Sequence, residues 1–131
     1  MKCLFDNNLS PKLAKTLNFL EGDDGIIVEH LREKFPSDAS DVDWINKLAK
    51  EGDWFVITQD NRIMKNTHER KAWKEARIPI VFLHKSWVKQ GFWDTSWKLI
   101  KCWPKLKEII IRDRKRKSFV LNTKGKIIEI A

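Results

Sequence analysis

The chain has 131 residues, 42% of them hydrophobic and 34% charged, with a formal net charge of +8. This length suits one domain and is too short for two ordinary ones, and no apolar run approaches the roughly 20 residues that span a bilayer. The first residues lead directly into a strand, so we expect no signal peptide and a cytoplasmic protein. Cys3 and Cys102 belong to no C-x-x-C motif and are expected as reduced thiols.

The basic charge is concentrated in the second half of the chain. Residues 1–60 hold 7 Lys/Arg and 12 Asp/Glu, a net charge of −5, and residues 61–131 hold 19 and 6, a net charge of +13. Clustered Lys and Arg provide most of the non-specific affinity of proteins for nucleic acid. The second half is therefore expected to bind a polyanion; a solvated surface that only aids solubility is the alternative.

Strands alternate with helices along the first 85 residues. Ser10-Pro11 is a strong helix start, because Ser can cap and Pro suits the first helical position. Strands are expected at 2–6, 26–28, 54–58 and 79–83, and helices at about 11–21, 41–51 and 67–77. This alternation predicts βαβ units and a parallel sheet.

After residue 85 the pattern changes to a long helix and a hairpin. Residues 94–112 predict a helix that Pro104 should kink or split in two. The strands 118–121 and 126–130 flank a turn and predict a terminal β-hairpin. We expect one domain over 1–131, with a core at 1–85 and the helix and hairpin of 86–131 as an appendage.

Three of the seven tryptophans are expected in the core. Trp44, Trp73 and Trp103 lie on apolar helix faces, which favours the core over base stacking, whereas the pattern assigns no place to Trp93 and Trp97.

Three Asp residues are expected at one edge of the sheet. Asp6 and Asp60 each end an apolar strand, and Asp41 opens the helix that leads into the second of those strands. Ligands of open α/β sheets bind outside the carboxyl ends of the strands. Carboxylates without Cys or His partners suit a hard cation such as Mg²⁺ or Mn²⁺. In a basic protein, such a site points to chemistry on phosphodiesters.

Four candidate carboxylates, Asp6, Asp41, Asp43 and Glu69, also have a structural explanation. Asp6 could form an Asx-turn, and Ser40 or Asp41 could cap the second helix. Asp43 lies in the first turn of that helix, where negative charge is favourable without a metal. Glu69 fits a capping box in which Asn66 is the cap.

The densest basic segment is R-D-R-K-R-K at residues 112–117, which could be a solvated turn or an arm that contacts phosphates. The candidate contacts to nucleic acid are Arg62, Lys65, His68, Arg70, Arg114, Lys115 and Arg116.

Four short motifs together resemble the PIN-like family. They are M-K-C-L-F-D-N-N-L-S-P at residues 1–11, D-V-D-W-I at 41–45, V-I-T-Q-D at 56–60 and I-P-I-V-F-L at 78–83. The resemblance covers residues 1–85, and the C-terminal helix and hairpin look like those of VapC-type toxins. It implies a three-layer α/β/α fold with a central, mainly parallel sheet.

The resemblance also implies a Mg²⁺- or Mn²⁺-dependent endoribonuclease, often a toxin held inactive by a protein antitoxin. Carried over by position, Asp6, Asp41 and Asp60 hold the metal, and Glu69 and Asp43 are further candidate ligands. The chain departs from the family pattern in having Asp41 at a helix start, where a Glu within a helix is commoner, and no clear fourth Asp after Asp60.

Three further points stay open at this stage. A homodimer is one. A second is a module of the same fold that binds nucleic acid or an antitoxin without cleaving. The third is a phosphatase with Asp6 as nucleophile, against which Asn8 counts because that chemistry commonly uses a second Asp at this position.

Overall fold

One six-stranded sheet runs through the molecule. The computed structural model describes residues 1–60 and 66–130. The strand order is β2-β1-β3-β4-β5-β6, and every neighbouring pair is parallel except β5 with β6. The strands are β1 (Lys2–Phe5), β2 (Ile27–His30), β3 (Trp54–Thr58), β4 (Ile80–Leu83), β5 (Ser118–Leu121) and β6 (Ile127–Ile130). The expected mainly parallel sheet is confirmed.

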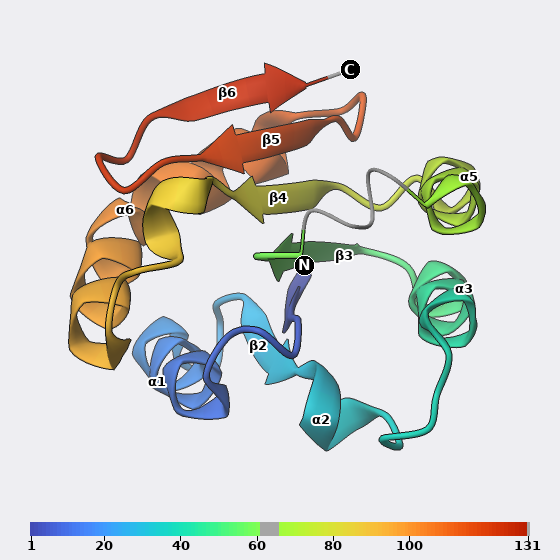
Figure 1. The fold of residues 1–131 in the computed structure, drawn as a ribbon, viewed down its shortest axis with the longest axis horizontal. Helices are drawn as coiled ribbons and strands as arrows, with labels where there is room; N and C mark the ends of the chain where they lie inside the picture. Colours follow the sequence, from blue (N-terminus) through green and yellow to red (C-terminus); the bar gives the residue numbers. More distant parts are fainter. Residues whose placement is uncertain (61–65, 131) are drawn as a thin grey trace.

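Helices cover both faces of this sheet, which gives three layers (Figure 1). They are α1 (Pro11–Glu21), α2 (Leu31–Lys34), α3 (Asp41–Glu51), α5 (Thr67–Ala76) and α6 (Phe92–Arg112), with a 3₁₀ turn η1 (Lys85–Trp87). Successive strand residues point to opposite faces, so Cys3 and Phe5 join the core under α1 and α6, whereas Leu4 joins the core under α3 and α5. The sheet is therefore buried on both faces.

Side-chain caps explain where the helices begin. The Ser10 Oγ accepts a hydrogen bond from the Lys12 N–H (3.1 Å), and Pro11 occupies the first helical position. The Ser40 Oγ accepts one from the Asp43 N–H (3.1 Å), so Ser40 is the cap of α3. These starts confirm the helix boundaries expected from the sequence.

The sequence predicted either a kink or a split at Pro104; α6 continues through Pro104 as one helix of 21 residues, so the split is wrong. A proline removes one backbone donor, but the apolar side of α6 is held against the sheet along its whole length by Leu99, Trp103, Leu106 and Ile110, all buried. Although α6 is long, no helix within residues 1–60 and 66–130 combines the length and the apolar character needed to cross a membrane.

The C-terminal hairpin extends the central sheet. The strand β5 pairs in parallel with β4, and β6 pairs antiparallel with β5. On the α1 and α6 side, the Trp103 ring lies 6.5 Å from that of Phe5 and 6.2 Å from that of Phe55. Residues 86–130 therefore share a sheet and a core with the first 85 residues.

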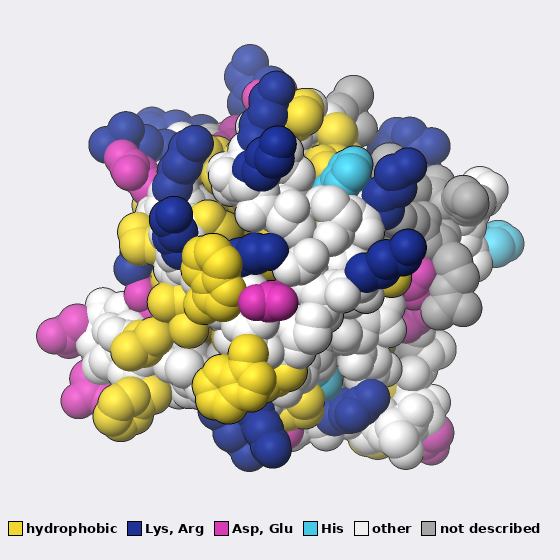
Figure 2. Space-filling view, turned by 60° about the vertical axis from the view of Figure 1, so that its left-hand side comes forward, with side chains coloured by type: hydrophobic (Ala, Val, Ile, Leu, Met, Phe, Trp, Pro, Cys, Tyr) yellow, Lys and Arg dark blue, Asp and Glu magenta, His cyan; other side chains and the backbone are white. Residues whose placement is uncertain are grey.

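The tryptophans divide between the core and the surface. Trp44, Trp73 and Trp103 are buried, as expected, whereas Trp93 is 81% and Trp97 50% exposed. Figure 2, which brings forward the left-hand side of Figure 1, shows hydrophobic side chains gathered at the surface among Lys and Arg. The two tryptophans that the sequence left unassigned therefore belong to the surface.

Candidate active site

Asp6 lies at the carboxyl edge of the sheet, directly after β1, and is only 8% exposed. Its Oδ1 accepts a hydrogen bond from the Asn7 N–H (2.7 Å), and its Oδ2 accepts one from the Thr58 hydroxyl (2.7 Å). The Asp6 N–H donates to the carbonyl of Ile57 (3.1 Å). Contacts to the ends of two neighbouring strands therefore hold this buried carboxylate in one position.

The electrostatic surroundings of Asp6 include the other two predicted ligands. Burial raises the pKa of Asp6, hydrogen bonds from Thr58 and Asn7 lower it, and the charges of Asp60 and Asp41 raise it further; the net change is upward. Because Asp60 and Asp41 act on Asp6 through space, the fold brings the three predicted carboxylates into one region at the sheet edge.

Thr58 connects two of these residues, and the sequence analysis did not assign it a role. Its buried hydroxyl donates to Asp6 and accepts a hydrogen bond from the Asp60 N–H (2.9 Å). The available signal was its place in the T-Q-D end of β3, two residues before Asp60. Thr58 therefore positions the carboxylate of Asp6 and the backbone of Asp60 without being an expected ligand itself.

Thr58→Val should therefore loosen the site while keeping the shape of the side chain. Removing the hydroxyl leaves the buried Asp6 without one donor, so we expect a loss of about 1–3 kcal/mol in the free energy of unfolding. Metal affinity should fall roughly 10–100-fold, as is usual when a group that orients a ligand is lost. Urea denaturation and Mn²⁺ titration measure the two effects. Thr16→Val, which removes a hydroxyl on the exposed side of α1, is the control and should change neither by much.

Asp41 is not needed as a helix cap, because Ser40 performs that role. The Asp41 side chain is exposed, and its Oδ1 accepts a hydrogen bond from the Trp44 Nε1–H (3.0 Å). Asp43 is exposed in the first turn of α3, where its charge is favourable near the positive end of the helix dipole. The structure thus removes the capping explanation for Asp41 and keeps the helix-dipole explanation for Asp43.

At α5 the cap is Asn66, as the capping-box alternative expected. Its Oδ1 accepts hydrogen bonds from the N–H groups of His68 (3.0 Å) and Glu69 (3.2 Å). Glu69 is half-buried in the first turn of α5, and Asp60 is half-buried shortly after β3. A metal-ligating role for Glu69 stays a prediction.

The donor set suits Mg²⁺ or Mn²⁺ in its chemistry, since carboxylate oxygens are the ligands these ions prefer. Within the described ranges, 1–60 and 66–130, no three or more His, Cys, Asp or Glu side chains are grouped closely enough to hold an ion as they stand. Asp6 is held rigidly, whereas Asp41 is exposed at a helix start. Binding would therefore require the side chains of Asp41 and Asp60 to close on Asp6.

The raised pKa of Asp6 predicts how its removal affects the metal-free protein. A carboxyl group with a raised pKa favours the folded state when protonated, and this contribution is lost as the pH rises through the raised value. Asp6→Asn, in EDTA, should therefore raise the melting temperature at pH 7 by roughly 2–5 °C, the size expected for about 1 kcal/mol. The gain should shrink towards pH 4. Thermal melts at both pH values check this, and an equal destabilisation at both would contradict it.

The predicted contacts to nucleic acid separate into three groups. Arg70, Lys115 and Arg116 line one cavity. His68 and Arg114 are exposed and do not line it. Arg62 and Lys65 lie outside the described residues.

The protein is thus a three-layer α/β/α domain with a buried Asp at the carboxyl edge of its sheet and two more Asp acting on it. A family model described as PIN like domain matches residues 1–85. The chain therefore belongs to the PIN-like domain family, whose members are commonly nucleases and typically use divalent metals. No curated protein and no solved structure matches the chain.

Proposed function

We propose that this protein is a Mg²⁺- or Mn²⁺-dependent endoribonuclease that hydrolyses RNA phosphodiesters. The observation that carries the proposal is the buried carboxylate of Asp6, held between β1 and β3 and under the charges of Asp60 and Asp41. A buried carboxylate surrounded by two more is costly unless a cation neutralises them. The site therefore has the electrostatics of a divalent-cation site.

In this proposal Asp6, Asp41 and Asp60 hold the cation, and Thr58 orients Asp6 and Asp60. A divalent cation bound there would supply Lewis-acid chemistry, which makes a water a better nucleophile and offsets charge on the phosphate. The second half of the chain, with its net charge of +13, would bind the RNA backbone. The three Asp residues would thus hold the metal ion, whereas the Lys and Arg residues would bind the RNA.

Direct assays test the proposal. Purified protein should cut at least one member of a panel of structured and unstructured RNAs when Mn²⁺ or Mg²⁺ is added, and should stop cutting in EDTA. The metal alone should also raise the melting temperature, because it binds the folded state, and Asp6→Asn and Asp60→Asn should lose most of that rise. Parent-like responses to Mn²⁺ in both variants would place the metal elsewhere.

A second candidate is a module that binds nucleic acid without cleaving it. The absence of a ready three-ligand group among residues 1–60 and 66–130 favours this alternative. It predicts RNA binding with no cleavage of any panel member in Mn²⁺.

We also propose that the protein is the toxin of a toxin–antitoxin pair in the cytoplasm, with a protein antitoxin as partner. The support is the likeness of the C-terminal helix and hairpin to those of VapC-type toxins. Expression without a partner should arrest growth, and expression of Asp6→Asn should not. If the parent protein and Asp6→Asn arrest growth equally, the arrest does not depend on RNA cleavage. A homodimer belongs to the same proposal, and light scattering of the purified protein measures it.

A further inference from the structure

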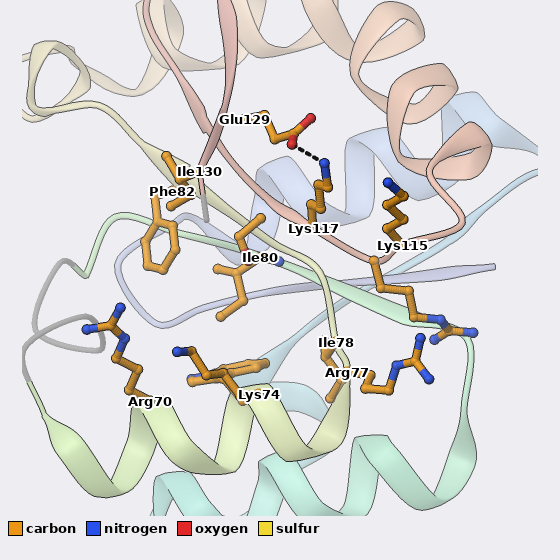
Figure 3. A pocket seen from close by; sticks show the side chains of 13 residues that line it. Arg70, Lys74, Arg77, Ile78, Ile80, Phe82, Lys115, Lys117, Glu129 and Ile130 are labelled. Carbon is orange, nitrogen blue, oxygen red and sulfur yellow. Dashed lines mark hydrogen bonds and ion pairs between the residues drawn. The ribbon is translucent and has the colours of Figure 1, made fainter.

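A cavity of about 530 Å³ lies between α5, the strands β4 to β6 and the segment that precedes β5 (Figure 3). Its volume is in the range of small-ligand sites. The Lys and Arg side chains around it are Arg70, Lys74, Arg77, Lys115, Arg116 and Lys117. The only carboxylate in the described lining is Glu129, which is paired with Lys117. We call this cavity the basic groove; its uncompensated charge calls for an anionic ligand.

The inner surface of the basic groove is apolar. Its lining contains the edges of four buried core side chains and the half-buried Ile130; the buried ones are Trp73 of α5, Ile78, Ile80 and Phe82. The Trp73 indole N–H is buried and has no hydrogen-bond partner among residues 1–60 and 66–130. A buried donor without an acceptor costs about 1–3 kcal/mol. A ligand of the groove therefore carries negative charge and places an apolar part against this lining.

Two arginines of the groove have unusual backbone conformations. Arg77 ends α5 at φ 55°, and Arg116 precedes β5 at φ 53°. Both values fall in the left-handed region, which is disfavoured for residues other than Gly, Asn or Asp. At Arg77 this conformation closes the end of α5, where its N–H donates to the carbonyls of Trp73 and Lys74.

The basic groove opens on the same face of the sheet as the candidate active site. Thr58, which donates to Asp6, is paired in register with Phe82 of the groove. The helix α5 follows β3 in the chain and precedes β4, and it runs along the groove from Arg70 to Arg77 (Figure 3). Arg70 follows directly after Glu69. A chain held in the groove would therefore lead towards Asp6.

We propose that the basic groove binds a single-stranded segment of RNA, with phosphates on the Lys and Arg side chains and a base against the half-buried Ile130, beside the edges of Trp73 and Phe82 in the cavity wall. Grooves that combine cations with aromatic surfaces are typical of single-strand binding. This proposal rests on the proposed function for its link to Asp6. An acidic, amphipathic protein segment is the competing occupant, and continuity with the candidate active site favours the nucleic acid.

Binding of a fluorescein-labelled RNA octamer, measured in EDTA over a series of salt concentrations, tests the groove without cleavage. Lys74→Glu should weaken binding about tenfold and flatten the dependence on salt, because a phosphate contact is lost. The matched control is Lys71→Glu, the same change on the same helix at an exposed position outside the lining. It should have less than about a threefold effect. Equal weakening by the two variants overturns the proposal.

A second variant tests the apolar surface separately from the charge. Ile130→Trp narrows the cavity from the half-buried end of β6 and changes no charge. It should weaken binding at least about fivefold, the lower end of what loss of a base contact costs, with the dependence on salt unchanged. Parent-like affinity would show that the RNA lies outside the cavity.

Competition separates the two occupants. Unlabelled single-stranded RNA should displace the octamer, whereas duplex RNA and an amphipathic Glu/Leu peptide should do so only at much higher concentration. Displacement by the peptide at lower concentration than RNA overturns the proposal in favour of a protein partner. RNA cleavage is measured in a separate assay. If the binding experiments confirm the groove but the protein never cuts RNA, only the proposed function is contradicted. If the protein cuts RNA but Lys74→Glu and Lys71→Glu bind the octamer equally well, only the groove proposal is contradicted.

Discussion

Asp6→Asn is expected to lower metal-dependent RNA cleavage at least about 10²-fold, since it removes a ligand of the cation that activates the nucleophile and stabilises charge. The fold should survive, because Asn keeps the size of the side chain and can still accept from the Asn7 N–H. RNA binding should also survive, because the Lys and Arg side chains expected to bind RNA lie mainly in the second half of the chain. Initial rates of cleavage and affinity in EDTA measure the two quantities.

A suitable control is Asp24→Asn, which removes the same charge from an exposed turn before β2, at the opposite edge of the sheet. It should leave cleavage within about twofold of the parent. The cleavage rate of Glu69→Gln should lie between those of the two variants if Glu69 is a metal ligand. If Glu69 only stabilises the N-terminus of α5, the substitution should lower stability and leave the cleavage rate unchanged. Full activity in Asp6→Asn would remove Asp6 from the site.

The second large effect concerns stability. Trp103→Ala should cost about 3–5 kcal/mol in the free energy of unfolding, the usual result of truncating a large buried aromatic side chain. Trp103 is 4% exposed, packs against Phe5 and Phe55, and its Nε1–H donates to Glu21 (3.3 Å). Since domains are stable by only about 5–15 kcal/mol, much of the chain should unfold at moderate urea. The control is Trp97→Ala on the same helix at a half-exposed position, with an expected cost below about 1 kcal/mol.

The same contacts predict that residues 1–85 cannot fold alone, although the family model ends there. Without α6 and β5, the core side chains Phe5 and Phe55 lose Trp103, and β4 becomes an exposed edge. A chain of residues 1–85 should show no cooperative unfolding transition. A cooperative melt of this fragment would show that the C-terminal part is an independent unit.

Local signals in the sequence determined most of the elements of this protein. Ser10-Pro11 and Gly22 bound α1, and the apolar runs of β1 and β3 are recognisable because parallel strands buried on both faces are continuously hydrophobic. The order of β1, α3 and β3 also placed Asp6, Asp41 and Asp60 at one edge, since carboxyl ends of parallel strands meet there. The boundaries of these elements depend on neighbours in sequence, so sequence alone was sufficient for them, whereas the metal-ligating role of the three Asp residues stays a prediction.

Tertiary packing decided the features that depend on residues far apart in the chain. Pro104 was expected to be able to split its helix, and only the buried side of α6 explains why the helix continues. The role of Thr58 depends on a hydrogen bond to Asp6, 52 residues away. The basic groove joins α5 to the segment before β5, more than 35 residues later, because β5 happens to pair with β4. No local pattern encodes such pairs, since their energy comes from surfaces that meet only after the sheet has formed.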